Sequence, residues 1–300
     1  MTARLWIFTT FSTIAAVVGA SAAIAYAVDP YGILRDPKGR DLIVYFFELK
    51  AKYLVNERYV PANFDGLIIG PSSSANWDVP SLAGARIYNE SIPGGNAAEE
   101  QMLVDRALDK GHFKMAVFIL EPSMTANHDI NEGVAATKNV EAFGSFHLFA
   151  HEAAFALHAA HIKFNKSDSS PNGKLVLNYA KRIQAAKLGA GQFNIDREGL
   201  NDYRDLIESL QAKGATIVYV APPVYEPQYK LNEAAYKTYL DTIRMYLPPG
   251  PIINMNGPEY IAFRSNPDNY LDCWHLEPQG ASTVTTLLEK LVPQAISSRH

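Results

Sequence analysis

Short apolar segments alternate with helical patterns along most of the chain, and this alternation limits the fold more than any other feature. Five segments have the length and apolar character of buried strands: 64–70, 85–92, 115–120, 216–221 and 251–255. Helical patterns lie between or after them at 97–110, 199–213, 233–246 and 280–295. Strands connected through helices form parallel sheets that helices cover on both faces. The sequence therefore predicts an α/β fold, a three-layer α/β/α arrangement around a parallel sheet of about five strands.

The amino-terminal segment is apolar enough for a membrane. Residues 5–28 carry no charge, and a helix of that length exceeds the roughly 30 Å hydrocarbon core of a bilayer. The alternative is a cleaved signal peptide, because Ala25-Tyr26-Ala27 is an A-x-A site. The uncharged run is longer than a signal-peptide core, which favours a retained helix. We expect residues 1–30 to be a membrane anchor (or signal peptide) and residues 31–300 to form the α/β domain.

Residues 124–200 are too many for a short crossover and indicate a helical insertion, with its main helix at 141–165. Insertions beside an active face commonly shape a substrate groove or contact a partner. Four histidines share one face of that helix: His147, His151, His158 and His161. No acidic residue joins them at a metal-ligand spacing, so we expect a polar stripe, no metal site and no cofactor.

Composition excludes two classes of function. Lys plus Arg is 27 against 31 for Asp plus Glu, a net charge of −4, so there is no basic surface of the kind that binds nucleic acid. Cys273 is the only cysteine, which excludes an intramolecular disulfide and a cysteine-rich zinc site.

The first strand ends in Gly70-Pro71-Ser72, followed by small residues. Ligands of parallel sheets bind beyond the carboxyl ends of the strands, where the Ser72 hydroxyl is expected. We expect Ser72 at a helix start, where the backbone N–H favours developing negative charge. Serine and glycine are also common simply as capping residues, so this block is not specific on its own.

A second block follows the last strand. Asp272 and His275 are three residues apart in a short loop before the final helix. A nucleophilic serine needs a base, and the base needs a carboxylate that fixes its tautomer. Asp-x-x-His supplies both from one loop on the same edge of the sheet as Ser72.

These blocks resemble those of the SGNH (GDSL-type) hydrolase superfamily, in its membrane-anchored branch. Gly70-Pro71-Ser72 stands at the nucleophile block, and Asp272-Cys273-Trp274-His275 resembles the last block. Residues 88–95 (YNESIPGG) resemble the second block, and Asp29-Pro30-Tyr31-Gly32 follows the apolar segment as in anchored relatives. The resemblance implies a flavodoxin-like sheet.

The resemblance also implies roles for single residues. Ser72 would be the nucleophile, His275 the general base and Asp272 its orienting carboxylate. The N–H groups of Ser72 and of Gly94 or Gly95 would hold the oxyanion. Pro71 replaces the usual aspartate, and the third block, Gly-x-Asn-Asp, is absent. Its oxyanion-binding asparagine would need a substitute, for which the candidates are Asn127, Ser123 and Asn96.

Residues near these blocks are candidates for contacts with substrate. Trp77 and Trp274 lie within five residues of Ser72 and His275, and they would either stack on a sugar ring or pack in the core. Tyr225 follows the fourth strand and lines the groove unless Pro222-Pro223 merely ends that strand. Glu121 ends the third strand, either as a substrate contact or as the partner of a basic residue.

The function expected is serine-dependent ester hydrolysis or acyl transfer, with acetyl as the expected acyl group. By resemblance, the substrate is an acylated polysaccharide of the cell envelope or an exported one. We expect a single-pass protein of the cytoplasmic membrane with its domain in the periplasm and with partner proteins in the envelope. The alternative is a catalytically degenerate scaffold or binding subunit of a polysaccharide export or modification complex, which the missing third block and the insertion favour.

Overall fold

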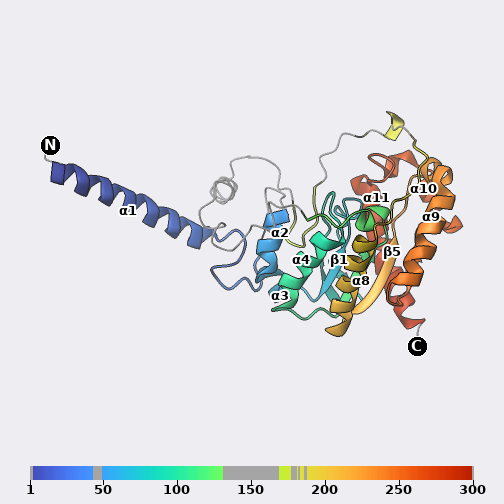
Figure 1. The fold of residues 1–300 in the computed structure, drawn as a ribbon, viewed down its shortest axis with the longest axis horizontal. Helices are drawn as coiled ribbons and strands as arrows, with labels where there is room; N and C mark the ends of the chain where they lie inside the picture. The colour runs from blue at the N-terminus through green and yellow to red at the C-terminus, as the bar shows by residue number, and fades with distance from the viewer. Residues whose placement is uncertain are drawn as a thin grey trace.

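The computed structural model describes residues 3–42, 49–130, 169–176, 181, 183–185 and 188–298. These residues form a mixed α/β fold around a mostly parallel six-stranded sheet, with a long apolar helix at the amino terminus (Figure 1). The sequence predicted about five parallel strands, and five parallel strands are present. The sixth is a short antiparallel strand at one edge.

The strand order in the sheet is β2-β3-β1-β4-β5-β6. The strands are β1 (Gly66–Ile69), β2 (Ser81–Leu82), β3 (Ala85–Asn89), β4 (Met115–Ile119), β5 (Thr216–Ala221) and β6 (Ile252–Asn254). The edge strand β2 turns into β3 through Ala83 and Gly84, both with positive φ (45° and 82°). Two such residues form the tight turn whose twist matches a hairpin. β2 was missed because two residues are too few to show alternation.

The long helices lie close to their expected positions, with one exception. The helices are α1 (Ala3–Val28), α2 (Leu49–Asn56), α3 (Tyr59–Asn63), α4 (Ala97–Leu108), α8 (Arg197–Ala212), α9 (Glu226–Tyr246), α10 (Ile261–Arg264) and α11 (Pro278–Ser297). Short 3₁₀ turns are η1 (Pro122–Thr125), η2 (Ile183–Ala185), η3 (Pro258–Tyr260) and η4 (Pro267–Asn269). α9 begins at Glu226 instead of residue 233, with Pro227 in its first turn, where proline costs no hydrogen bond.

Each face of the sheet has its own hydrophobic core. Alternate residues of β4 divide between them: Ala116 and Phe118 face one cluster, and Val117 and Ile119 face the other. α4, α8 and α9 pack in the first cluster, and α11 packs in the second. The loops described below follow the carboxyl ends of the parallel strands.

Only part of the predicted insertion falls within the described residues. The helix expected at 141–165 and its four histidines lie outside them. Residues 169–176 form a turn closed by the Ser169–Leu175 bridge. This turn lies against the end of β3 and the loop after Ser72, since Asn89 N donates to Asn172 O (2.7 Å) and Leu175 N donates to Ala75 O (2.7 Å).

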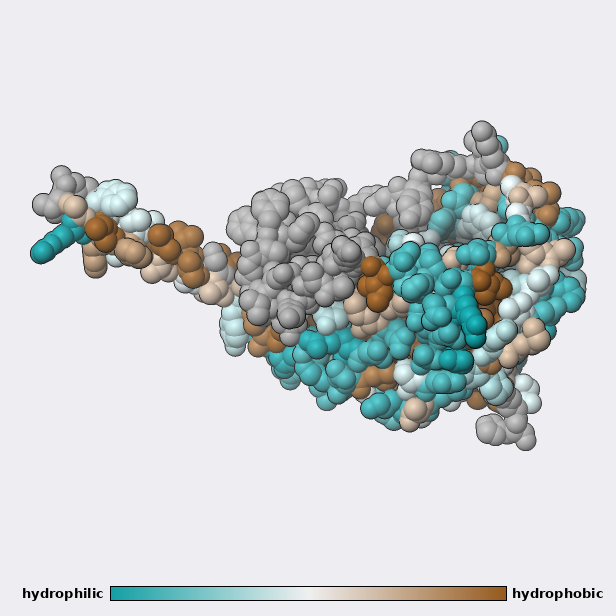
Figure 2. Space-filling view, viewed as in Figure 1, coloured by the Kyte–Doolittle hydropathy of each residue, from teal (hydrophilic) through white to brown (hydrophobic). Residues whose placement is uncertain are grey.

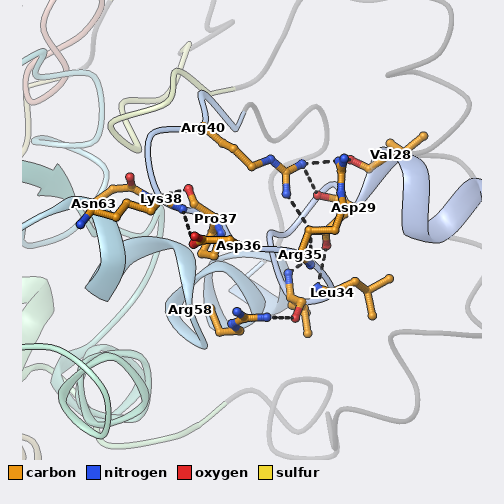
Figure 3. A network of polar contacts seen from close by, with 11 residues as sticks. Val28, Asp29, Leu34, Arg35, Asp36, Pro37, Lys38, Arg40, Arg58 and Asn63 are labelled. Carbon is orange, nitrogen blue, oxygen red and sulfur yellow. Dashed lines mark hydrogen bonds and ion pairs between the residues drawn. The ribbon is translucent and has the colours of Figure 1, made fainter.

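α1 is apolar enough to cross a membrane, and none of its most hydropathic stretch is buried against the domain. It extends away from the domain with its apolar side chains on the surface (Figures 1 and 2). Immediately after it, the buried Asp29 carboxylate accepts hydrogen bonds from the backbone N–H groups of Ile33, Leu34 and Arg35 and from the Arg40 guanidinium (Figure 3). Asn63 of α3 in turn bonds Pro37 O and Gly39 N. We call residues 29–40 with Arg58 and Asn63 the exit clamp.

Candidate active site

Ser72 lies just beyond the carboxyl end of β1, between the ends of β3 and β4. Pro71 bridges Ile92, so the pairing of β1 with β3 continues for one more step before the chain turns. Residues 71–77 then form successive turns, in which Ser74 N donates to Pro71 O and Ala75 N donates to Ser72 O (3.2 Å each). The prediction of a helix start at Ser72 is wrong, because these turns do not continue into a helix.

The structure brings Ser72, His275 and Asp272 together in one chain of hydrogen bonds. His275 Nε2 lies 2.8 Å from Ser72 Oγ. His275 Nδ1 lies 3.0 and 2.9 Å from the two carboxylate oxygens of Asp272. With Nδ1–H donated to the carboxylate, Nε2 accepts from the serine hydroxyl, which is the tautomer a general base needs.

The loop itself holds Asp272 in place. The backbone N–H groups of Trp274 and His275 both donate to Asp272 Oδ1 at 2.9 Å, and Leu271 N donates to His275 O at 2.8 Å. Burial raises the pKa of Asp272, but the hydrogen bonds from the His275 ring and from the two N–H groups outweigh it. The net effect is a pKa below the usual value, so Asp272 is an anion at neutral pH.

The second predicted block forms a tight turn beside Ser72. Gly95 N donates to Ile92 O (3.0 Å), Pro93 follows Ile92, and Gly94 has φ of +73°. Proline at the second position and a left-handed glycine at the third are typical of a type II turn. Because Gly95 N–H closes the turn, Gly94, which is exposed, is the glycine left to donate to an oxyanion. We call residues 92–95 the glycine turn.

The predicted substitutes for the missing asparagine have other partners. Asn96 caps α4, with its Oδ1 accepting from Glu99 N, and its Nδ2 donates to Asn127 Oδ1 (2.5 Å) and to Asp129 O (2.8 Å). Ser123 Oγ donates to Glu121 Oε1 (3.0 Å). Asn127 is exposed and bonded to Asn96. Asn96 and Asn127 are therefore bonded to each other and Ser123 to Glu121, and within the described part of the chain none of the three makes a hydrogen bond to Ser72.

Glu121, just after the end of β4, is bonded to the residue next to Ser72. Its carboxylate accepts from the hydroxyls of Ser73, the neighbour of Ser72, and of Ser123. Burial raises its pKa, and the two hydroxyls and the charge of His275 only partly offset that effect. Within the described residues, the partners of its carboxylate are hydroxyls, not the basic residue that was one of the two expectations from the sequence.

The aromatic candidates divide between core and groove. Trp77 is fully buried in the cluster under α11, so it packs in the core and does not offer its ring to a sugar. Tyr225 packs against Tyr270 with ring centroids 5.5 Å apart. Trp274 is half-buried and packs near Tyr236. It lines a hollow of about 10 Å³ with Ser73 and Glu121, a volume that holds about one water molecule.

The side chains described at this site are not arranged to bind a metal ion. Among the described residues, no group of three or more His, Cys, Asp and Glu side chains is arranged to hold a metal ion. The four histidines of the insertion lie outside the described residues, so the expectation that they bind no metal stays a prediction.

Comparison with known proteins adds little to this geometry. No protein-family model and no curated protein matches the chain. A solved structure from Streptococcus pneumonia, whose name includes the words "platelet activating factor", aligns with 81% of this chain and 90% of its own. The sequence identity is 14% and the TM-score is 0.44, a similarity too low to assign a family or an activity.

Proposed function

We propose that this protein is a serine-dependent acyl esterase or acyltransferase. The observation that carries the proposal is the continuous hydrogen-bonded chain from Ser72 through His275 to Asp272 at the carboxyl edge of the sheet. The order of the five parallel strands also supports the proposed three-layer, flavodoxin-like arrangement of the SGNH type. Renumbered among themselves the parallel strands run 2-1-3-4-5, and ligands of such sheets bind where the order reverses, next to the first strand.

In this mechanism His275 Nε2 takes the proton of Ser72 Oγ while Oγ attacks the ester carbonyl carbon. The carbonyl oxygen becomes an oxyanion, which the N–H groups of Ser72 and Gly94 stabilise. His275 then gives its proton to the leaving alcohol as the C–O bond breaks, and an acyl-serine remains. Water or a sugar hydroxyl attacks that ester with His275 again as the base, and the product is a free acid or a new ester.

The substrate class and the location are part of the same proposal. α1 is apolar enough to cross a membrane, which supports a protein held there. The proposal places the domain in the periplasm, with envelope proteins as partners. Such a protein would act on acylated polysaccharide of the envelope or on exported polysaccharide. The acyl group proposed is acetyl, as the sequence resemblance implies.

A second candidate function is a scaffold subunit that has lost catalysis. The contacts of Asn96 favour it, because the amide donors of this candidate for the missing asparagine go to Asn127 Oδ1 and Asp129 O. Loss of one oxyanion donor commonly lowers a rate by about 10²–10³-fold.

The deciding experiment is covalent labelling of the full-length chain in detergent with a fluorophosphonate, followed by intact mass and peptide mapping. We expect one adduct, on Ser72, that is absent from Ser72→Ala and His275→Ala. Ser282→Ala, which removes an exposed serine on α11, is the matched control and should label like the wild type. Failure of the folded wild type to label would favour the scaffold.

An esterase and a transferase differ in the molecule that attacks the acyl-serine, which is water in an esterase and a sugar hydroxyl in a transferase. With a labelled acetyl ester as donor, an esterase releases acetate at a rate that added oligosaccharide does not change. A transferase moves the label to the oligosaccharide, and mass spectrometry of the glycan detects the product.

A further inference from the structure

The buried ammonium group of Lys52 binds backbone carbonyl groups just before the glycine turn. Lys52 of α2 is only 3% exposed, and its Nζ donates to Asn89 O (2.6 Å) and Ser91 O (3.0 Å). These carbonyls belong to the last residue of β3 and to the residue just before the turn. The Lys52 ammonium also lies 5.5 Å from the centre of the Tyr88 ring.

The same segment is bonded to the nucleophile loop. Asn89 Nδ2 donates to Ser74 O (2.8 Å) and Trp77 O (3.1 Å), and the hydroxyls of Ser74 and Ser91 are 2.8 Å apart. Lys52 therefore fixes the point at which the loop that carries Ser72 and the loop that carries Gly94 meet.

Two buried carboxyl groups accompany the ammonium. Glu90 and Glu100 are at most 1% exposed, and Asn56 Nδ2 donates to Glu90 Oε1 (3.0 Å). Burial lowers the pKa of Lys52, and the charges of Glu90 and Glu100 oppose that effect. A buried charge of this kind costs stability unless it is paired and hydrogen-bonded. What an ammonium supplies, and no apolar side chain can, is several N–H donors for diverging carbonyls.

We propose that Lys52 is a positioning residue for acyl transfer: by holding the carbonyls of Asn89 and Ser91, it orients the glycine turn so that Gly94 N–H faces the oxyanion formed at Ser72. This inference rests on the proposed function. It adds to the site a residue from a helix that precedes the sheet and carries none of the sequence blocks.

The test compares the wild type with Lys52→Met/Glu90→Gln, a double variant that removes the ammonium together with one carboxyl group. We expect kcat for p-nitrophenyl acetate to fall by about 10–100-fold with KM nearly unchanged, since only transition-state stabilisation is lost. Affinity for a trifluoromethyl ketone, which forms a tetrahedral adduct with a serine, should fall in parallel. The acid limb of the pH profile should stay in place, because the pair of His275 and Asp272 is untouched.

The matched control is Lys237→Met/Asp241→Asn, which removes an exposed lysine–aspartate pair on α9 and should leave both constants unchanged. Hydrogen exchange at residues 91–95 gives a readout that needs no activity, and we expect faster exchange in the Lys52 double variant.

Three results would overturn the inference: kcat within twofold of the wild type, unchanged exchange at the glycine turn, or a loss of kcat that simply follows a lower melting temperature. A wild type that neither labels at Ser72 nor hydrolyses the ester refutes the proposed function and the role of Lys52 in it. Altered exchange in that case would leave Lys52 as a structural residue only.

Discussion

At the scale of single residues, two carboxyl groups at the same edge of the sheet have opposite electrostatic environments. Asp272 receives N–H donors from its own loop and from His275, which lower its pKa despite partial burial. Glu121 is more deeply buried with hydroxyl partners, and its pKa is raised. Environments that separate the pKa values of nearby acids commonly divide their roles. Asp272 is therefore held in its charged form, and the environment of Glu121 favours its neutral form more than that of an exposed carboxyl group does.

Asp272→Asn should lower kcat strongly with little effect on folding. The amide keeps the shape of the side chain, but it is neutral and turns the hydrogen-bonding preference of His275 toward the wrong tautomer. We expect a loss on the order of 10³–10⁴-fold in ester hydrolysis, measured with an activated acetyl ester, and a melting temperature close to that of the wild type. A loss below tenfold would contradict the role given to Asp272.

Glu90 makes stability depend on pH. Burial raises its pKa from 4.5 to about 7, although the charge of Lys52 and the Asn56 hydrogen bond oppose that rise. The unfolded chain therefore loses this proton at lower pH than the folded chain does, so the stabilising contribution is complete below about pH 4.5 and is lost as pH rises through about 7.

Glu90→Gln should remove this part of the pH dependence. Its free energy of unfolding, from urea titrations at several pH values, should fall less than that of the wild type between pH 4.5 and 8, by roughly 1–3 kcal/mol. Glu100 remains as a partner for Lys52. Parallel curves for variant and wild type would show that Glu90 does not titrate in this range.

The residues predictable from sequence were those whose chemistry has a fixed spacing. Asp-x-x-His in one loop and a serine after a strand indicated Asp272, His275 and Ser72, which the structure places in contact. The direction in which an aromatic side chain points has no such signature, so the sequence left Trp77 either stacked on a sugar or packed in the core, and the structure places it in the core. Lys52 was missed because a lone lysine in a helix is almost always exposed, and only the folded chain shows its burial.

At the scale of elements, β1 and β4 lie so close together that no side chain fits at Gly70, where the loop that carries Ser72 begins. A Cβ on Gly70 would lie 2.5 Å from Ile119 Cγ1 and 2.7 Å from Ser74 Oγ. Glycine is needed there for space, because both neighbours are packed into the sheet and the loop. The turn toward Ser72 therefore depends on a contact between two strands far apart in the sequence.

Gly70→Ala should destabilise the fold and displace the nucleophile. Overpacking of this kind costs about 1–3 kcal/mol, which urea unfolding measures, and labelling of Ser72 by a fluorophosphonate should slow. Gly189→Ala is the matched control, since a Cβ there meets nothing within 4 Å. Equal unfolding curves for the two variants would show that the sheet yields at Gly70 without cost.

Element positions were predictable where burial makes a long apolar run. The five parallel strands begin and end within about three residues of their expected limits. β2 and the successive turns after Ser72 were not predictable, since pairing with β3 and hydrogen bonds within residues 71–77 create them. The early start of α9 was hidden by Pro227, which reads as a breaker unless its place in the first turn is known.

At the scale of the whole molecule, the exit clamp connects a helix that can span a membrane to the domain that carries the site. Asp29 has a positive φ of 41° and ends α1, and its carboxylate gathers three backbone N–H groups within residues 33–35. Arg58 donates to Ile33 O (2.6 Å), which fixes the same segment to the region just before α3. A segment held at both ends in this way keeps the domain at a defined distance from the end of α1.

Asp29→Ala should loosen that connection while it leaves α1 itself unchanged. The change removes a buried acceptor from the N–H groups of Ile33, Leu34 and Arg35 and from Arg40, and it places alanine at a φ that disfavours it. In detergent or lipid nanodiscs we expect cleavage by trypsin after Arg35, Lys38 or Arg40 to become at least tenfold faster, measured by mass spectrometry of the fragments.

Asp29→Asn keeps one acceptor oxygen and tolerates positive φ, so its cleavage rate should lie between those of the wild type and Asp29→Ala. Ester hydrolysis by the intact chain should not change, because Ser72, His275 and Asp272 share no partner with Asp29. Equal cleavage of all three proteins would show that other contacts hold the segment, and loss of Ser72 labelling in Asp29→Ala would show that the clamp supports the site as well as the connection.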